Sequence, residues 1–386
     1  MSKKKVLATS WHPGGANAII PVIRRLKEDE IFEVVTIGYE FSEKSFHDAG
    51  IDFRRIQDYG VGDVSYDSME KILAKETPNL ILTGTSIQDV KHRDVIEQTT
   101  TLVGRRIGIK TLSALDFWGD YHERFSDLEF SSATDFTVKD KFKFLPDKIA
   151  VPDVYSMKEM LREGFDEEII VVTGNPYFDS LESKAREFSV DDKKRVREQV
   201  GLEKDVLLLY AGGILRMDVP KFGYWDLDNI DIINRALKNS SVDAGLVSKL
   251  HPRSPDDYVK EMNDYVKNNG EGRIKLVRDI NPHQLILASD MTFTACSTLA
   301  FEAALMGKPC VSLQPGLKCP DYLANLTKNE IIPVGYTREV CDGIARRVLI
   351  DPSYTTNELL PKLSDVKADG KATERVTNLV YEMANA

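Results

Sequence analysis

Short apolar runs alternate with amphipathic segments of helix length along the whole chain. The runs are rich in Val, Ile and Leu, and segments of ten or more residues separate most of them. This spacing is typical of parallel strands that are buried on both faces and joined by helices. The sequence therefore predicts an α/β fold. The predicted strands begin at Lys5, Glu33, Asn79, Arg106, Lys148, Ile169, Asp205, Asp243, Arg273, Asp290 and Lys308.

The alternation is interrupted once, after the run that begins at Ile169. A strongly charged segment follows, predicted as a single helix over 182–200, and a fresh strand then opens a second series that resembles the first. The boundary accordingly falls between Thr173 and Asp205. We expect an N-terminal domain of residues 1–180 and a C-terminal domain of residues 181–386, whose polar, helical-looking tail is free to pack back on the N-terminal domain.

Length and composition agree with this division. A chain of 386 residues is long enough for two domains of ordinary size. Its 42% hydrophobic and 29% charged content is typical of a soluble globular protein. No apolar run approaches the roughly 18 residues of a membrane span. All four cysteines lie in the last quarter without metal-like spacing, which favours a reducing, cytoplasmic compartment.

The net charge of −10 argues against a general nucleic-acid binder, because such proteins need basic patches to replace counterions. The charge says nothing against a small anionic ligand held by local groups. In open α/β sheets, ligands bind beyond the carboxyl ends of strands, so the loops that follow the predicted strands are the places to look for chemistry.

Two such loops belong to the first domain. Gly14 and Gly15 follow the first strand after His12, and paired glycines at a helix start let backbone amides approach an anion or a sugar. Asp116 follows the strand that begins at Arg106, in a stretch where acids alternate with aromatic residues. That composition suits carbohydrate, and Asp116 or His12 is a candidate general base. A tight turn and an ordinary interdomain loop are the alternatives.

Two loops of the second domain mirror them. Gly212 and Gly213 follow its first strand, and Arg216 comes three residues later, where it could hold a phosphate or pair with a surface acid. His251 and Arg253 end the strand that begins at Asp243. A proline after His251 restricts its backbone to extended conformations, so its side chain has a fixed direction, as a ligand contact or as a structural hydrogen-bonding group.

A further second-domain loop carries two adjacent hydroxyls and a carboxylate. Ser297 or Thr298 is a natural N-cap, so the free amides of the following helix would form an anion site. Glu302 lies four residues after Thr298 on the same helix face, where it could accept hydrogen bonds from vicinal hydroxyls such as those of a ribose. The alternative is a capped helix with a carboxylate that offsets its dipole.

Taken together, these elements resemble the GT-B superfamily of nucleotide-sugar enzymes. The resemblance rests on the His-Pro-Arg loop at His251, on Ser297-Thr298 followed by Phe301-Glu302-Ala303 and Gly307-Lys308-Pro309, and on the order of the two halves. The stretch Thr173–Leu181 is similar to the T-G-N-x3-D-x-L hinge of non-hydrolysing UDP-N-acetylglucosamine 2-epimerases. The resemblance covers the whole chain and implies two Rossmann-like, doubly wound domains facing across a cleft.

The resemblance also implies roles for particular residues. The nucleotide would lie mainly on the C-terminal domain, with Ser297 and Thr298 at its phosphates, Glu302 at its ribose and His251 near the donor. The Gly14-Gly15 loop would face the transferred sugar.

Departures from the epimerase pattern favour a different reaction. The epimerases carry Gly-Asp-Thr where this chain has Gly84-Thr85-Ser86, and their His-Arg-Arg-Glu run is replaced by residues 211–216. Their acidic loop is echoed only by Leu115-Asp116-Phe117. The resemblance to transferases that build capsules and other surface polymers therefore favours glycosyl transfer.

We therefore expect a metal-independent glycosyltransferase without a cofactor, moving a sugar from a nucleotide-sugar donor to a carbohydrate or lipid-linked acceptor in surface polysaccharide synthesis. Asp226 and Asp228 have the Asp-x-Asp spacing of a metal clamp but lie in an acidic, surface-like run. Two alternatives stay open: a nucleotide-sugar 2-epimerase or hydrolase, and a non-catalytic nucleotide-sugar binding protein. The oligomeric state and a peripheral contact with the inner face of the membrane are also open.

Overall fold

The structure is a computed structural model that describes residues 3–88, 95–127, 142–213, 215–251, 254–328, 330–359 and 369–385. The chain divides into two compact units. Unit 1 comprises Met1–Asp179 together with Val366–Ala386, and unit 2 comprises Ser180–Asp365. The C-terminal residues thus belong to the same unit as the N-terminus.

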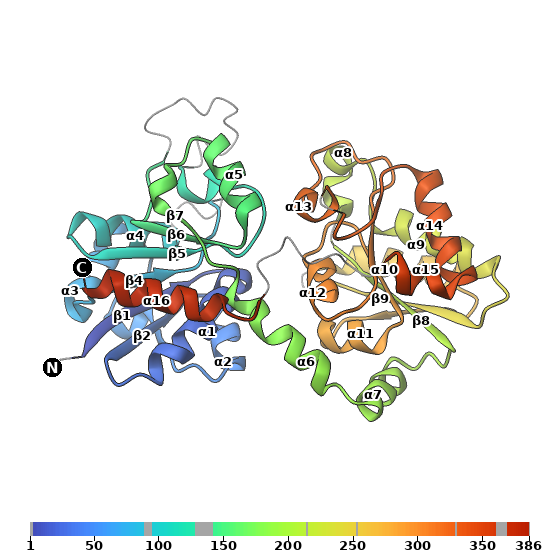
Figure 1. Ribbon diagram of the computed structural model, residues 1–386, viewed down its shortest axis with the longest axis horizontal. Helices are drawn as coiled ribbons and strands as arrows, with labels where there is room; N and C mark the ends of the chain where they lie inside the picture. Colours follow the sequence, from blue (N-terminus) through green and yellow to red (C-terminus); the bar gives the residue numbers. More distant parts are fainter. Residues whose placement is uncertain are drawn as a thin grey trace. The chain divides into compact units, whose positions relative to one another are not determined.

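Unit 1 is built on a seven-stranded parallel sheet with the order β3-β2-β1-β4-β5-β6-β7. Helices cover both faces of this sheet (Figure 1). The strands are β1 (Lys4–Ser10), β2 (Phe32–Gly38), β3 (Arg54–Arg55), β4 (Leu80–Thr83), β5 (Lys110–Ala114), β6 (Lys148–Val151) and β7 (Ile170–Val172). The helices are α1 (Pro13–Lys27), α2 (Phe41–Asp48), α3 (Tyr66–Glu76), α4 (Ile96–Arg106), α5 (Val154–Arg162) and α16 (Ala372–Asn385).

The core of unit 1 follows from the period-two alternation of its strands. In β1, Val6 and Ala8 pack with α1 and α16, whereas Leu7 packs on the other face with residues of α3 and α4. The apolar side of α16, including Val376 and Val380, is fully buried in the first of these clusters. The last helix of the chain therefore completes one face of the N-terminal sheet and lies beside α1 (Figure 1).

Unit 2 repeats this plan with a six-stranded parallel sheet of order β10-β9-β8-β11-β12-β13. Its strands are β8 (Val206–Ala211), β9 (Ala244–Lys249), β10 (Ile274–Val277), β11 (Met291–Thr294), β12 (Cys310–Leu313) and β13 (Val334–Gly335). Its helices are α6 (Leu181–Glu187), α7 (Val190–Val200), α8 (Val219–Phe222), α9 (Asp226–Lys238), α10 (Asp256–Asn269), α11 (Pro282–Ala288), α12 (Leu299–Leu305), α13 (Ala324–Thr327), α14 (Arg338–Ile350) and α15 (Pro352–Asn357).

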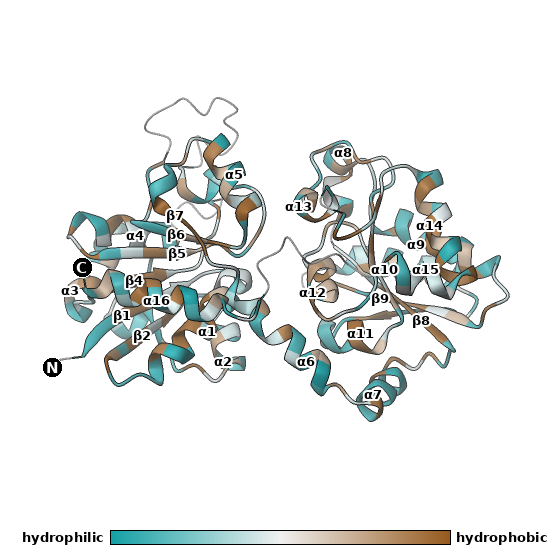
Figure 2. Ribbon diagram, in the orientation of Figure 1, coloured by the Kyte–Doolittle hydropathy of each residue, from teal (hydrophilic) through white to brown (hydrophobic). Residues whose placement is uncertain are grey.

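Hydropathy follows the layers in both units. The central strands are predominantly hydrophobic, while the helices carry alternating hydrophobic and hydrophilic residues (Figure 2). This is the arrangement expected of sheets buried on both faces, and the α/β class predicted from the sequence is confirmed. No helix among the described residues is both long and apolar enough to span a lipid bilayer.

Each predicted strand is present. The predicted elements differ from the structure in three details. The two-residue edge strands β3 and β13 are too short to give a sequence signal. The strand expected from Arg106 begins at Lys110, because α4 runs to Arg106 and Gly108 then turns the chain with a φ of 81°. The single helix expected over 182–200 is two helices, because Ser189 and Asp192 form a capping box that starts α7 afresh.

Candidate functional site

The strand order determines where ligand loops gather in each unit. In unit 1 the chain winds outward in opposite directions from β1 and β4, and in unit 2 from β8 and β11. Ligands of such open sheets bind beyond the carboxyl ends of the strands at these switch points. The loops after these four strands carry Gly14 and Gly15, Thr85, Gly212 and Gly213, and Ser297 and Thr298. Three of the five predicted loops therefore lie at the topological switch points, whereas the loops with Asp116 and His251 follow β5 and β9.

In unit 1, two glycines let the loops after β1 and β4 touch. A Cβ atom on Gly15 would lie 3.1 Å from Gly84 Cα and 3.1 Å from the Thr85 backbone nitrogen. A Cβ on Gly84 would lie 2.7 Å from Gly15 Cα. Neither position has room for a side chain, so the backbones of the two loops pack directly against each other.

Asp116, which follows β5, lies beside the first turn of α1 and next to this contact. A Cβ on Gly14 would lie 2.1 Å from Asp116 Oδ2, so the missing side chain makes room for the carboxylate. Asp116 Oδ1 accepts hydrogen bonds from Arg124 Nη1 and Thr85 Oγ1, both at 3.1 Å. Its side chain is 15% exposed. One carboxylate oxygen is thus fixed by two donors, while the other faces the first turn of α1.

Glu97, in the first turn of α4, was missed by the sequence analysis. Its Oε1 accepts hydrogen bonds from the Trp11 backbone N–H (2.8 Å), Ser10 Oγ (3.1 Å) and Ser86 Oγ (2.7 Å). Its Oε2 is buried without a hydrogen-bond partner, and burial raises the pKa of Glu97. A carboxyl group that binds both switch-point loops holds them in register. No sequence signal marks it, since a Glu in the first turn of a helix is common.

His12 is the N-cap residue of α1, with extended backbone. Its ring lies 4.2 Å from the ring of Trp11 and 5.6 Å from the ring of Phe41, measured between centroids. The structure thus places His12, Gly14 and Asp116 together around the amino end of one helix.

In unit 2, the double-glycine loop is held by an acid. The Gly212 N–H donates to Lys249 O (3.2 Å), and the Gly213 N–H donates to Asp226 Oδ1 (2.8 Å). Asp226 is fully buried and also accepts from the Leu215 N–H at 3.1 Å. Both glycine N–H groups therefore have protein acceptors, and what the glycines offer a ligand is close approach of the backbone.

The basic residues predicted for unit 2 have distinct surroundings. Arg216 pairs with Asp257 (2.7 Å) and Glu261 (3.1 Å) of α10, a surface pairing of the kind considered as its alternative role. His251 lies two residues beyond the end of β9 and is half-buried, with its backbone carbonyl bound by the Ser254 N–H. Arg253 lies outside the described residues.

The hydroxyl and carboxylate group after β11 is assembled around a buried hydrogen bond between His283 and Glu302. Thr298 occupies the N-cap position of α12, but Ser297 Oγ is the atom that accepts the Leu299 N–H, at 3.3 Å. Glu302 is 5% exposed; its Oε2 lies 2.5 Å from His283 Nε2 and its Oε1 accepts from Thr298 Oγ1 at 3.4 Å. His283 was not among the predicted residues. It follows Asn281-Pro282, where Asn281 caps α11.

The Asp-x-Asp spacing at Asp226 and Asp228 serves the fold. Asp226 holds the glycine loop, and Asp228 accepts the Trp225 backbone N–H at 3.0 Å at the start of α9. Among the described residues, no group of three or more His, Cys, Asp or Glu side chains is arranged to hold a metal ion. All four cysteines are free thiols.

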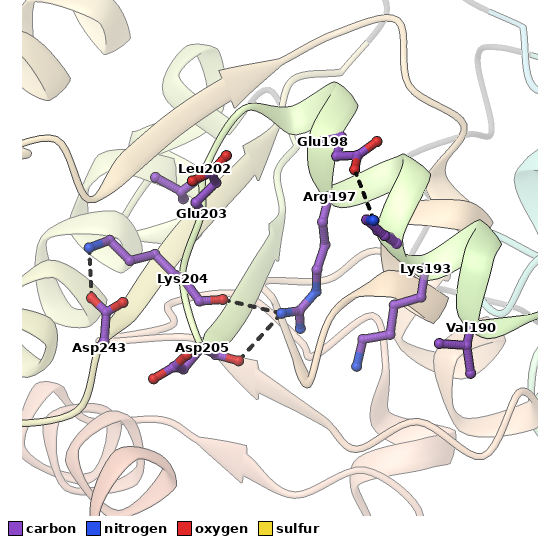
Figure 3. Close-up of a pocket in the computed structure, with 10 residues that line it drawn as sticks. Val190, Lys193, Arg197, Glu198, Leu202, Glu203, Lys204, Asp205 and Asp243 are labelled. Atoms are coloured by element: carbon purple, nitrogen blue, oxygen red, sulfur yellow. Dashed lines mark hydrogen bonds and ion pairs between the residues drawn. The ribbon is translucent and has the colours of Figure 1, made fainter.

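A cavity of about 560 Å³ in unit 2 lies away from these loops (Figure 3). Its lining comes from α7 and from Leu202–Asp205 and Asp243, which precede β8 and β9, so it lies at the amino edge of the sheet. Two of its cations are paired with acids: Lys204 with Asp243 at 2.6 Å, and Arg197 with Asp290 at 2.5 Å. Arg197 Nη1 also donates to the carbonyls of Lys204 and Asp205. The cavity contains none of the predicted site residues.

Comparison with known protein families and curated sequences gives one match. Residues 220–315 match the family model described as capsule polysaccharide biosynthesis protein. This segment contains His251, Ser297, Thr298 and Glu302. A search of curated protein sequences gives no match.

Solved structures match over the full length. The S. aureus MnaA–UDP complex is 17% identical with a TM-score of 0.69, covering 99% of this chain and 97% of that one. The Neisseria meningitidis UDP-GlcNAc 2-epimerase bound to UDP-GlcNAc is 15% identical with a TM-score of 0.67, covering 98% and 100%. Anabaena Alr3699/HepE in complex with UDP and glucose is 16% identical with a TM-score of 0.64, covering 99% of each chain.

The chain shares the fold of the UDP-GlcNAc 2-epimerases. Its two doubly wound, parallel-sheet units correspond to the GT-B-like architecture of those proteins over nearly their whole length. The two Rossmann-like, doubly wound domains expected from the sequence resemblance are confirmed.

Proposed function

We propose that the protein is a glycosyltransferase of surface polysaccharide synthesis that uses a nucleotide-sugar donor. Use of a nucleotide sugar is supported by the fold, which is similar to structures holding UDP, UDP-GlcNAc, or UDP with glucose. The polysaccharide context is supported by the capsule-synthesis match over 220–315. That segment includes the hydroxyl and carboxylate cluster proposed to bind the nucleotide, with Ser297 and Thr298 at the phosphates and Glu302 at the ribose.

The observation that favours glycosyl transfer over epimerisation is the set of groups around Asp116. At the position where the resembling epimerases have the acid of Gly-Asp-Thr, this chain has Thr85, whose hydroxyl donates to Asp116 Oδ1. Arg124 donates to the same oxygen. Thr85 thus places a neutral hydroxyl where the epimerases have an acid for elimination and re-addition. Asp116 keeps Oδ2 to accept the proton of an acceptor hydroxyl. A single oriented carboxylate suits the deprotonation of an acceptor hydroxyl.

In the proposed reaction, the acceptor hydroxyl gives its proton to Asp116 Oδ2 as its oxygen bonds to the anomeric carbon of the donor sugar. The bond from the anomeric carbon to the phosphate oxygen breaks, and its electron pair leaves with the nucleotide. The hydroxyls of Ser297 and Thr298 and the side chain of His251 stabilise the charge that develops on the phosphate. Arg216 is assigned no such role, because its guanidinium is engaged by two acids of α10.

A ligand screen followed by turnover tests this proposal. Thermal shift with UDP-, CDP-, CMP- and GDP-sugars should identify a stabilising donor, since a ligand at 100 times its Kd stabilises the folded state by about 2.7 kcal/mol. Mass spectrometry should then find sugar transfer only with an acceptor present. Asp116→Asn should keep donor binding and lose transfer, whereas Glu302→Ala should weaken nucleotide binding.

Two outcomes would redirect the assignment. Donor consumption without an acceptor would favour an epimerase or hydrolase, which the similarity to 2-epimerase structures keeps as the second candidate. Binding without turnover would favour a nucleotide-sugar binding protein. Stabilisation by none of the nucleotides would remove the proposal.

A further inference from the structure

An aromatic group extends from the switch-point loop of unit 1 toward solvent. It consists of Trp11 and His12, which follow β1, and Phe41, the first residue of α2 after β2. The His12 and Phe41 rings are nearly parallel, with an interplanar angle of 10° and centroids 5.6 Å apart. Trp11 packs beneath His12 and is 3% exposed, whereas Phe41 is 45% exposed. We call these three side chains the aromatic platform.

The backbone that presents Phe41 is strained. Glu40 has φ 48° and ψ −110°, a conformation that residues with a side chain rarely adopt. Its carboxylate accepts the indole N–H of Trp11 at 2.7 Å, so the strained residue also anchors the base of the platform. Holding the large apolar ring of Phe41 at the surface does not stabilise the fold, so the strained conformation of Glu40 has no structural benefit there. Strained backbone of this kind is concentrated at binding sites.

The platform adjoins the proposed catalytic carboxylate. His12 caps α1, and Gly14, in the first turn of α1, is the residue whose missing side chain makes room for Asp116 Oδ2. β1 and β2 are adjacent parallel strands, so the loops after them emerge at the same edge of the sheet. Among the residues that the structure describes, two carboxylates lie beside the platform: Glu40, which accepts the Trp11 indole N–H, and Asp116, whose other oxygen is bound by Arg124.

This combination selects a class of ligand. Carboxylates accept hydrogen bonds from hydroxyl groups and repel phosphates. Flat aromatic rings pack against the apolar C–H face of a pyranose. We propose that the aromatic platform is a binding subsite for an uncharged pyranose ring, which stacks on Phe41 and His12 and donates hydroxyl hydrogen bonds to Glu40 and Asp116. The inference rests on the proposed function, because it specifies the sugar that unit 1 holds next to Asp116.

Two sources could supply this ring: an acceptor glycan, or the sugar of the donor. Saturation-transfer NMR with the full-length protein separates them. The probes are the methyl β-glycosides of glucose, galactose and N-acetylglucosamine, and UDP-glucose. Signal from a methyl glycoside identifies an acceptor-type subsite. A Phe41-dependent sugar-ring signal that appears only with UDP-glucose identifies the donor sugar.

Substitutions at Phe41 test the stacking itself. Phe41→Ala should reduce the ring-proton signal at least fivefold, Phe41→Trp should retain it, and Phe41→Leu should lose most of it despite its apolar bulk. Ile107→Ala is the matched control, because Ile107 is also 45% exposed in unit 1 but lies at the end of α4. Equal signal from wild type and Phe41→Ala, or no signal from any glycoside or UDP-glucose, would overturn the proposal.

Calorimetry with UDP alone distinguishes this inference from the proposed function. UDP affinity should be the same in wild type and Phe41→Ala, because the nucleotide is assigned to unit 2. If methyl glycosides bind in a Phe41-dependent way and UDP does not bind, the platform stands and the nucleotide-sugar assignment falls. If UDP binds and no sugar signal depends on Phe41, the platform falls alone.

Discussion

Glu97 provides a direct test of how the switch-point loops of unit 1 are held. Three donors converge on its Oε1: the Trp11 backbone N–H and the hydroxyls of Ser10 and Ser86. In Glu97→Ala the two hydroxyls can rotate toward other acceptors; Ser10 Oγ already lies 3.3 Å from His12 O. The Trp11 N–H cannot rotate and loses its acceptor in a buried environment.

The magnitude follows from these contacts. A buried donor without a partner costs roughly 1–3 kcal/mol, and hydrogen bonds to a charged group contribute roughly 1.5–3 kcal/mol each. Removing the carboxylate also relieves the cost of burying it, which offsets part of this loss. We expect the local opening of the loop after β1 to become easier by about 3 kcal/mol, which corresponds to roughly a 100-fold change in the opening equilibrium.

Hydrogen exchange measures this opening residue by residue. The amide of Trp11 should exchange about 100-fold faster in Glu97→Ala, by the same conversion. Glu76→Ala is the control, since Glu76 is also buried in unit 1 but pairs with Arg54 and Lys5 at the opposite edge of the sheet. If Trp11 exchanges at the wild-type rate in Glu97→Ala, Glu97 does not hold the loop.

The raised pKa of Glu97 adds a pH dependence with a definite sign. Between the unfolded pKa, about 4.3, and the higher folded pKa, the folded state binds more protons than the unfolded state. Stability due to this group is therefore full below the unfolded pKa and is lost as pH rises through the folded pKa. The unfolding free energy of wild type minus that of Glu97→Gln should fall with rising pH across this window; a rising or flat difference would contradict the reasoning.

Three further predictions concern other parts of the two sites. Gly15→Ala should destabilise unit 1 by about 1–3 kcal/mol, because its Cβ would meet the backbone of the loop after β4, whereas Gly62→Ala, with open space around it, should leave the melting temperature within about 1 °C. His283→Ala should weaken UDP binding about tenfold by calorimetry, since Glu302 loses a buried partner; unchanged affinity would separate Glu302 from the nucleotide. Burial raises the pKa of Cys296 to about 12, so at pH 8 only about one thiol in 10⁴ is ionised, and mass spectrometry should find it unmodified by iodoacetamide under conditions that alkylate glutathione.

The fold could be predicted from the sequence because it follows from local patterns. The Val-, Ile- and Leu-rich runs and the helical segments between them are read residue by residue, and they specify parallel sheets covered on both faces. The same patterning located the loops that carry Gly14, Gly212 and Ser297 at strand ends, since ligand loops of such sheets follow strands. Edge strands of two residues left no pattern to read.

The partners of the site residues could not be read in this way. Glu97, Asp226 and His283 look like ordinary helix-start residues in the sequence, and their roles depend on segments brought close only by folding. Asp226 holds the loop after β8 from 13 positions away along the chain, and Glu97 binds Trp11 from 86 positions away. The exposure of Phe41 beside His12 likewise depends on the pairing of β1 with β2.

The sequence by itself thus determined the fold class, the strand-end loops and the residue types available for binding, because each depends on short-range periodicity and strand termination. Only the tertiary structure decided which carboxylate oxygens already accept hydrogen bonds from the protein and which are open to a ligand. Both oxygens of Asp226 accept backbone or hydroxyl donors, and Oε1 of the buried Glu97 accepts three, whereas Asp116 keeps Oδ2 beside the start of α1. That difference arises from contacts between distant segments, where a buried polar group must find its partner.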